Sequence, residues 1–294
     1  MATATESALF IDTSIQIARV IHGPQTKKAI RQRLSKHSTT VTSLVVRQEY
    51  KRRLLKEAEY LLRQLHRYRS FDEVHQHVIR LFGSWPGRVR KRTICLQALA
   101  QIHRGTDAER TERLQLYLRS LLVTGLRRFD QTVDEIRKDS QCACGLQDVV
   151  EKVKLRKYDL GPEKCSRTRQ GTCGVADFFA VKRQNWQAIL DKLKSLPAEK
   201  KSAELHNAEK FLDRLLKNPG AVKQDDPCLT VGDLLIALES AGVSHFFTLN
   251  SVESQHLCRA LGQSLIVRPI DPGKPEIVCP ADALQWPEFG PGAE

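Results

Sequence analysis

Two short apolar runs, near opposite ends of the chain, each stop at a polar side chain that can bind a metal ion. The first run ends at Asp12 and the second at Asn250. Two acids, Glu49 and Asp233, open amphipathic stretches. In an open α/β sheet, ligands bind outside the carboxyl ends of the strands, where side chains from several connections can meet. The pattern therefore predicts an α/β fold that gathers these four residues at one edge of its sheet.

Strand and helix patterns alternate near both ends of the chain. Residues 8–12 are expected to form a buried strand, and residues 40–46 a second one because they are rich in β-branched side chains. The segment between them, to about residue 33, is expected to be helical with a break at Gly23-Pro24. Near the carboxyl end we expect a helix over 231–240, a strand over 245–249, a helix over 252–261, a strand over 264–268 and an extended tail from 269.

The middle of the chain has helical periodicity. Leucines recur among Arg, Lys, Glu and Gln at helical spacing, which predicts a long helix from Glu49 to about Phe82, broken near Ser70. Residues 140–174, which hold four cysteines, are expected to be irregular. The other helices are expected over 89–103, 107–138, 177–196 and 203–217.

Charge favours a polyanionic partner. The chain of 294 residues has 47 Lys and Arg against 34 Asp and Glu, a formal net charge of +13. Clustered cations attract phosphates by releasing counterions, so nucleic acid is the expected partner, although a solvated basic surface has the same composition. The sequence has neither an apolar stretch long enough for a bilayer nor a secretory leader pattern. We therefore expect no membrane association and an intracellular, cytoplasmic location.

At the four motifs the chain resembles the PIN-domain family of nucleases. Members of that family have a first strand ending in Asp, a Glu at the start of the helix after the second strand, and an Asp that opens a later helix. A strand ending in Thr-x-Asn or Thr-x-Asp follows. The matching segments here are Phe10-Ile11-Asp12-Thr13-Ser14, Ser43-Leu44-Val45-Val46-Arg47-Gln48-Glu49, Gly232-Asp233-Leu234-Leu235 and Phe247-Thr248-Leu249-Asn250. The resemblance covers about residues 8–60 and 225–270.

The resemblance implies a fold, a site and an activity. The fold would be a mainly parallel sheet flanked by helices, formed by residues 1–60 and 222–294 and interrupted by a mostly α-helical insertion over 61–221. Asp12, Glu49 and Asp233 would bind Mg²⁺ or Mn²⁺, and Asn250 would complete the catalytic site. Carboxylate-bound divalent ions neutralise the phosphate and activate water, so the implied reaction is hydrolysis of phosphodiester bonds. The family mostly cuts RNA, which makes RNA the expected substrate.

Each of the four residues also has a purely structural interpretation. Asp12 can cap the helix that follows it, and Glu49 and Asp233 can be acids favoured by a helix dipole. Asn250 can be a turn residue. Asp225 and Asp226 compete with Asp233 for its role.

Four cysteines lie within 32 residues that are rich in Gly, and we predict that they bind structural zinc. They are Cys142, Cys144, Cys165 and Cys173. Four thiolates can surround Zn²⁺ and order a loop with few apolar side chains. Unliganded thiols and an iron–sulfur cluster are the alternatives.

Two other functions stay open from the sequence. The first is a PIN-like module with a weak or inactive site that binds nucleic acid or protein in a larger complex, since Asn250 stands where an acid would strengthen the site. The second is a DNA-cutting effector of defence. The insertion would select the substrate, cover the site or bind a protein partner.

Overall fold

The computed structural model describes residues 8–84, 95, 98–152, 157–161, 171–224, 227–269, 271, 273–287 and 289. Its centre is a six-stranded sheet in the order β3-β2-β1-β6-β7-β8. Every neighbouring pair is parallel except β7 and β8. The strands are β1 (Leu9–Ile11), β2 (Thr40–Ser43), β3 (Glu135–Arg137), β6 (His245–Thr248), β7 (Ser264–Val267) and β8 (Ile277–Cys279). The predicted α/β class with a mainly parallel sheet is confirmed.

The central strand explains why the sheet is buried on both faces. All three residues of β1 are fully buried and apolar, as parallel strands covered by helices usually are. The predicted break after the first helix is also confirmed. Helix α1 (Thr13–Ile21) ends at Ile21 with His22 as its C-cap, and α2 (Pro24–Leu34) begins with Pro24 in its first turn. Proline fits there because its missing N–H would have no partner in the helix.

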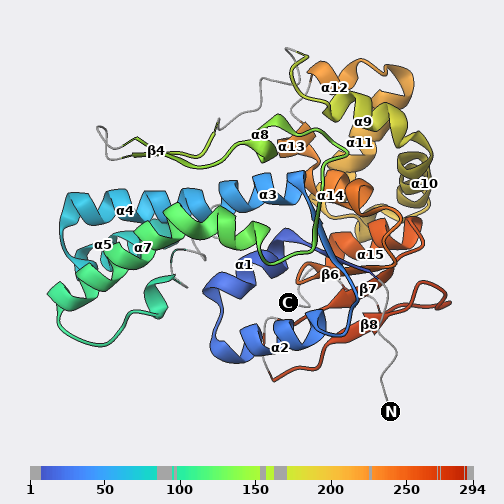
Figure 1. Ribbon diagram of the computed structural model, residues 1–294. Coiled ribbons are helices and arrows are strands. Elements are labelled where there is room, and N and C mark those ends of the chain that lie inside the picture. Colours follow the sequence, from blue (N-terminus) through green and yellow to red (C-terminus); the bar gives the residue numbers. More distant parts are fainter. Residues whose placement is uncertain are drawn as a thin grey trace.

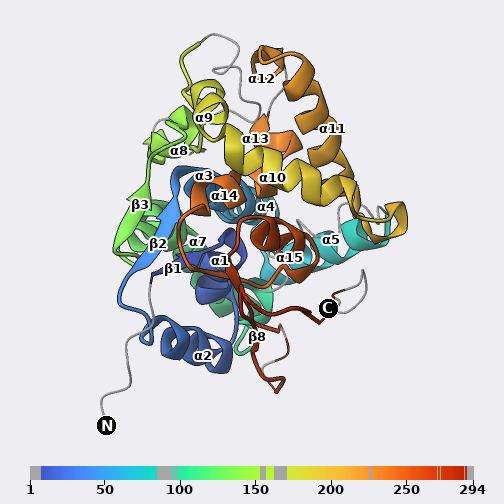
Figure 2. The same ribbon diagram turned by 90° about the vertical axis from the view of Figure 1, so that its right-hand side faces the viewer.

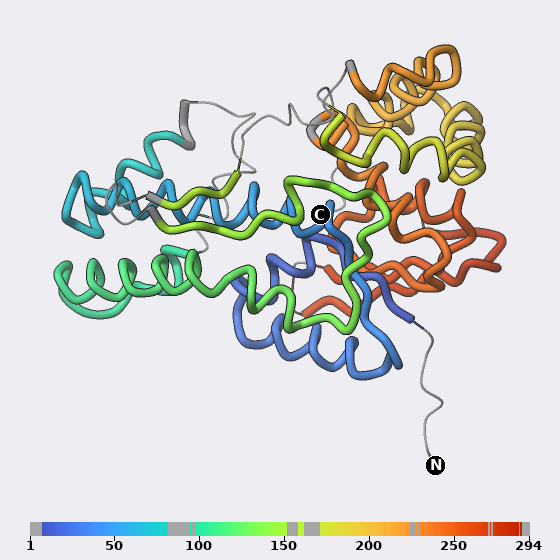
Figure 3. Tube along the Cα trace, turned by 45° about the horizontal axis from the view of Figure 1, so that its top comes forward, coloured from blue at the N-terminus to red at the C-terminus, as the bar shows by residue number. Residues whose placement is uncertain are grey.

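A helical arm extends from one side of the sheet (Figures 1 and 3). Helix α3 (Leu44–Tyr50) continues through a π-helical segment, η1 (Lys51–Leu55), into α4 (Lys56–Tyr68). Helices α5 (Phe71–Ser84) and α7 (Asp107–Asp130) pack against α4. Buried leucines at three- and four-residue spacing, such as Leu54, Leu61 and Leu65, form the interior of this arm. The predicted long helix and its break near Ser70 are confirmed.

A second group of helices lies next to the carboxyl half of the sheet (Figure 2). Helix α10 contacts both α11 and α15, and α14 contacts α3, β2 and α15. These helices are α9 (Val175–Val181), α10 (Arg183–Lys194), α11 (Ala203–Lys217), α12 (Ala221–Gln224), α13 (Pro227–Thr230), α14 (Gly232–Ser240) and α15 (Ser251–Ala260), with a 3₁₀ turn, η4 (Ala198–Lys200). The helices predicted over 203–217, 231–240 and 252–261 are confirmed to within a residue at each end.

The strand predicted over 40–46 is too long. It ends at Ser43, and the three following residues, Leu44 to Val46, begin α3. Ser43 caps this helix, since its hydroxyl accepts a hydrogen bond from the Val46 amide at 3.3 Å. The cap and burial of both valines outweigh the weak preference of β-branched residues for strands.

Two segments predicted as helix or tail contain strands of the sheet. The helix predicted to reach residue 138 ends at Asp130, and β3 follows and pairs with β2. Here the Asp134 carboxylate accepts hydrogen bonds from the amide and hydroxyl of Thr40, each at 2.7 Å, and so anchors the start of β3. In the expected tail, β8 pairs antiparallel with β7. Strand β3 lies inside the range of the predicted insertion, and the division into two domains stays a prediction.

The cysteine-rich segment is more regular than expected where it is described. It contains a short helix, α8 (Ala143–Leu146), and an antiparallel hairpin of β4 (Val150–Lys152) and β5 (Lys157–Asp159). The helix predicted over 177–196 is divided at Lys182 into α9 and α10. Most of the helix predicted over 89–103 lies outside the described residues. None of the helices in the described ranges is both long and apolar enough to cross a membrane.

Candidate active site

The strand order brings the two ends of the chain together. From β1 the chain proceeds to β2 and β3 on one side of the sheet, whereas β6 lies on the other side of β1. Ile11 pairs with Phe247, and the Asp12 amide donates to the Phe247 carbonyl at 3.1 Å. Asp12 and Asn250 therefore both follow strands at the point where the strand order reverses, the usual ligand site of such sheets.

Three hydroxyl and amide donors hold the Asp12 carboxylate. The Thr13 amide donates to Oδ1 at 2.6 Å, while the hydroxyls of Ser14 and Thr248 donate to Oδ2 at 2.7 and 2.8 Å. Burial, and then repulsion from Glu49, nevertheless raises the pKa of Asp12. The bond from Thr13 shows that Asp12 also caps α1, so the structural interpretation of this residue is correct. Capping leaves the second oxygen in a polar network shared by β1 and β6.

Glu49 lies beside Asp12, although it does not start its helix as predicted. Helix α3 begins five residues earlier, at Leu44, so Glu49 faces the site from the second turn. Its Oε2 accepts a hydrogen bond from the Thr13 hydroxyl at 2.5 Å, and its Oε1 is 2.5 Å from the Arg53 guanidinium. Since Thr13 contacts both Asp12 and Glu49, it fixes the two carboxylates relative to each other.

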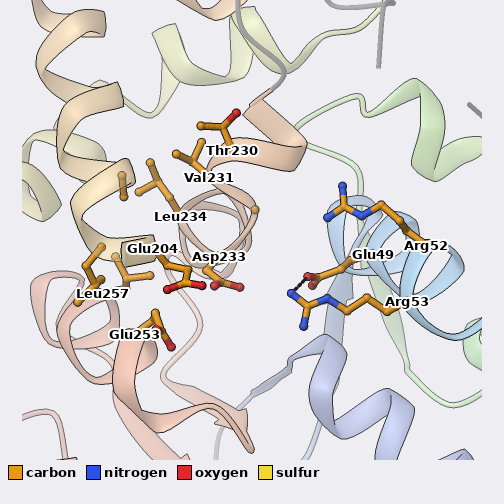
Figure 4. A pocket seen from close by; sticks show the side chains of 13 residues that line it. Glu49, Arg52, Arg53, Glu204, Thr230, Val231, Asp233, Leu234, Glu253 and Leu257 are labelled. Carbon is orange, nitrogen blue, oxygen red and sulfur yellow. Dashed lines mark ion pairs between the residues drawn. The ribbon is translucent and has the colours of Figure 1, made fainter. Parts of the chain in front are cut away.

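Asp233 completes the acidic cluster from the opposite side. It lies in the first turn of α14 and borders an opening of about 170 Å³ that Glu49 also lines (Figure 4). Burial, followed by repulsion from Glu49 and Asp12, raises the pKa of Asp233 to about 7. A cation bound beside Asp233 would favour its ionised form and so lower this pKa.

Asn250 shares a small cavity with Asp12 and Asp233. It precedes α15, but its side chain makes no capping hydrogen bond. The Oδ1 atom of Asn250 is buried and has no hydrogen-bond partner. Buried oxygen atoms are rarely left without a partner, so this oxygen is available to a ligand, water or ion. The structure thus brings together all four residues that the sequence singled out.

Neither Glu253 nor Glu204, which also line the opening, was assigned a site role from the sequence, and Arg53 was marked only as part of a basic stretch after Glu49. Glu253 on α15 is only 5% exposed, lines the same opening as Asp233, and has a buried Oε2 without a hydrogen-bond partner. Arg53 on η1 faces Asp233 and Glu253 across the opening in Figure 4. Glu253 follows Asn250 by one helical turn, which is the signal that could have identified it, and Arg53 follows Glu49 by four residues.

The site carboxylates and the cysteines do not form a ready-made metal cage. Among the described residues, no three His, Cys, Asp or Glu side chains are spaced to hold a metal ion. In the acidic cluster, Arg53 already neutralises Glu49. Asp225 and Asp226, the competitors of Asp233, lie outside the described residues.

The cysteines gather differently from the sequence prediction. Cys142, Cys144 and Cys173 are buried, whereas Cys165 lies outside the described residues. Cys228, which precedes Asp233 by five residues, lies close enough to Cys142 to interact with its thiol. A hydrogen bond with Cys173 lowers the pKa of Cys142. The interaction with Cys228 and burial outweigh that effect and raise the pKa of Cys142 to about 12. Metal-free Cys142 is therefore a protonated thiol at neutral pH. No sequence spacing connects Cys228 to the other three.

A fully buried carboxyl links the two helices that position Glu49 and Asp233. Glu239 on α14 accepts a hydrogen bond from the Val45 amide of α3 at 3.3 Å. Burial raises its pKa to about 7, although the neighbouring hydroxyls of Ser140 and Ser43 oppose the shift. The folded protein therefore retains a proton that the unfolded chain releases near pH 4.5.

Glu239→Gln is expected to remove this pH-dependent loss of stability. As pH rises from about 4.5 through 7, the wild type should lose on the order of 3 kcal/mol of unfolding free energy through Glu239, whereas the variant should not. Urea unfolding of both proteins at pH 5 and pH 8 measures the difference. An equal stability difference between variant and wild type at the two pH values would contradict the prediction.

Comparisons with protein-family models, curated proteins and solved structures found no match to this chain. The PIN-like resemblance therefore rests on the four motifs alone, and the candidate site is described by its own geometry.

Proposed function

We propose that the protein is a metal-dependent nuclease that hydrolyses phosphodiester bonds. The observation that carries the proposal is the convergence of Asp12, Glu49 and Asp233, from three distant segments, where the strand order of a parallel sheet reverses. Negative side chains repel one another, so three carboxyls buried together favour binding of a proton or a cation.

The donor set fits Mg²⁺ or Mn²⁺. These ions prefer oxygen ligands, and the site offers carboxylates together with the unpartnered oxygens of Asn250 and Glu253. A divalent ion bound here would neutralise phosphate charge and lower the pKa of water. Asp12 and Asp233 would bind it, with Glu49 as the third ligand once its carboxylate separates from Arg53. Thr13, Ser14 and Thr248 orient the carboxylates of Asp12 and Glu49 through the hydrogen bonds described above.

Two arginines support a phosphate-containing substrate. Arg52 and Arg53 line the opening on the side opposite Asp233 (Figure 4). Arg53 projects into water for nearly half of its side-chain surface and can contact a phosphate oxygen beside the carboxylates. The preference for RNA over DNA derives from the family resemblance, and the charge of +13 suits either polymer.

The direct test is cleavage by the purified protein. Labelled single-stranded RNA, single-stranded DNA and duplex DNA should be incubated with Mg²⁺, Mn²⁺ or EDTA. We expect RNA cleavage that requires the metal. Cleavage restricted to duplex DNA would support the defence effector, and cleavage unaffected by EDTA would contradict the metal mechanism.

A second candidate function is binding without cleavage. The ion pair between Glu49 and Arg53 favours it, because a guanidinium that stays on this carboxylate substitutes for the charge of a metal ion. In that case the module would bind RNA, or a protein partner through the helical arm, as part of a larger complex. Tight binding of RNA that remains uncut in every metal would support this candidate.

Structural zinc at the cysteine cluster is the remaining proposal. We expect about one equivalent of zinc in protein purified without chelators, bound by Cys142, Cys144, Cys165 and Cys173. Elemental mass spectrometry measures this zinc content.

The Cys173→Ser variant should lose the metal and melt at a lower temperature than the wild type, because four thiolates would connect separate loops. Cys279→Ser, in β8, serves as the control that retains zinc. Zinc-free protein in which all eight thiols react would contradict the proposal, and zinc lost in Cys228→Ser would assign Cys228 as a ligand.

A further inference from the structure

A second cavity lies between the sheet-side helices and the arm. It measures about 600 Å³ and is lined by residues of α1, α2, α3 and α7, together with Gln101, Gln131 and Thr132. The carboxyl end of α7 extends toward α1 in Figure 1. It shares no lining residue with the acidic opening. A cavity of this volume is within the usual range for small-molecule sites.

Four cationic side chains line the cavity, and the lining contains no acid. They are Arg19, Lys27, Arg31 and Arg128. In the described part of the chain, none of the four forms an ion pair with a carboxylate; Arg19 instead donates to the Thr132 carbonyl at 3.2 Å. Burial, followed by repulsion from Arg31, lowers the pKa of Lys27. Cations held together without counterions are costly, and an anionic ligand would remove that cost.

Two polar groups in the cavity wall also lack partners. Gln16 is only 3% exposed, and its Nε2 donor makes no hydrogen bond. Its Oε1 accepts from the hydroxyl of Thr132 at 3.3 Å, which orients the amide and leaves the donor available. The buried hydroxyl of Tyr117 is also unpartnered. Buried donors without partners are uncommon in folded proteins, so these two indicate a missing acceptor.

Part of the wall is apolar and aromatic. Tyr50 and Phe129 pack against each other with ring centroids 5.1 Å apart, and Val20 and Leu121 lie in the same lining. A small inorganic anion would leave this surface without a partner. A ligand that carries both a phosphate and a flat organic ring would contact the cations and the apolar wall at once.

We propose that the cavity binds a phosphate-bearing ligand of nucleotide size, with Arg19, Lys27, Arg31 and Arg128 around its phosphate. The same chemistry occurs in a free nucleotide and in the phosphorylated end of a nucleic-acid strand. The site is separate from the carboxylate cluster, so the proposal does not depend on nuclease activity.

A matched pair of double variants tests the site. Lys27→Gln with Arg128→Gln removes two lining charges, while Lys28→Gln with Arg127→Gln removes exposed charges from the same two helices outside the cavity. Isothermal titration with nucleoside 5′-monophosphates, and with the unphosphorylated nucleosides, measures free nucleotides. Fluorescence anisotropy with 5′-phosphorylated and 5′-hydroxyl RNA oligonucleotides measures strand ends. Every protein carries Asp233→Asn so that no strand is cut.

We expect the lining variant to weaken binding of the phosphorylated probe at least about tenfold, and the control variant to stay within about twofold of the parent. If the nucleoside monophosphates bind, the ligand is a free nucleotide. If only the phosphorylated oligonucleotide binds, the ligand is the end of a nucleic-acid strand. Equal loss in both double variants would overturn the proposal, as would equal affinity for probes with and without phosphate, or no binding of any probe. Melting temperatures within a few degrees of the parent confirm that both variants are folded.

Discussion

Asp12→Asn and Asp233→Asn are each expected to lower metal-dependent cleavage at least about 100-fold. Each variant replaces a charged carboxylate, which binds a divalent ion strongly, with a neutral amide of the same shape. Asparagine is as good a helix cap as aspartate, so Asp12→Asn keeps the start of α1 intact. Initial rates at saturating RNA and several Mn²⁺ concentrations separate weaker metal binding from slower cleavage.

Stability distinguishes loss of chemistry from loss of the fold. Burial and repulsion raise the pKa of both residues, so a neutral side chain should leave the metal-free protein at least as stable at pH 8. Asp177→Asn is the matched control, because Asp177 also lies in the first turn of a helix but is exposed. Full activity in either site variant, with normal folding, would contradict the assignment of that residue.

The apparent affinity for Mn²⁺ is expected to fall roughly tenfold for each pH unit below 7. The folded, metal-free protein keeps a proton on Asp233 up to a pKa of about 7, and a metal ion must displace it. Between pH 7 and pH 5 this competition should weaken binding about 100-fold. Titration calorimetry at constant ionic strength measures the affinity and the protons released.

Glu239 provides the control for this pH dependence, because its pKa is also raised to about 7 but its carboxyl lies between α3 and α14. Glu239→Gln should leave the change of Mn²⁺ affinity with pH as it is in the wild type. Asp233→Asn should abolish this pH dependence, along with most of the Mn²⁺ affinity. Metal binding that is independent of pH between 5 and 7, or a slope that disappears in Glu239→Gln, would contradict the role of Asp233.

Features set by local sequence were predictable. The apolar runs that end at Asp12 and at Thr248-Leu249-Asn250 identified two strands, and the resemblance implied that the sheet is mainly parallel. Parallel strands align their carboxyl ends at one edge of the sheet. The break between the first two helices was also clear, because Gly23-Pro24 marked it. The convergence of the four site residues followed from these local signals together with the resemblance.

Features set by tertiary contacts were not predictable. Strand β3 has only three residues, and its place in the sheet depends on Asp134 bonding to Thr40, 94 residues away in sequence. The start of α3 at Leu44 depends on a serine cap inside a strand-like run. The cavity charges come from three helices, and Cys228 reaches Cys142 across 86 residues. No spacing in the sequence reveals such encounters.

Some assignments stay predictions. The division into a nuclease domain and an insertion is such a prediction. Helix α4 of the arm continues α3, which contacts β2, and helix α7 of the arm is followed by β3 of the sheet. A protein partner for the arm is another.

Anomalous diffraction from crystals soaked in Mn²⁺ would locate a metal ion bound by the acidic cluster. We expect one strong manganese peak within coordination distance of the Asp12 and Asp233 carboxylates, with Glu49 turned toward the metal and away from Arg53. A map without manganese between these residues, and with the pair of Glu49 and Arg53 intact, would show that the acidic cluster is not a metal centre.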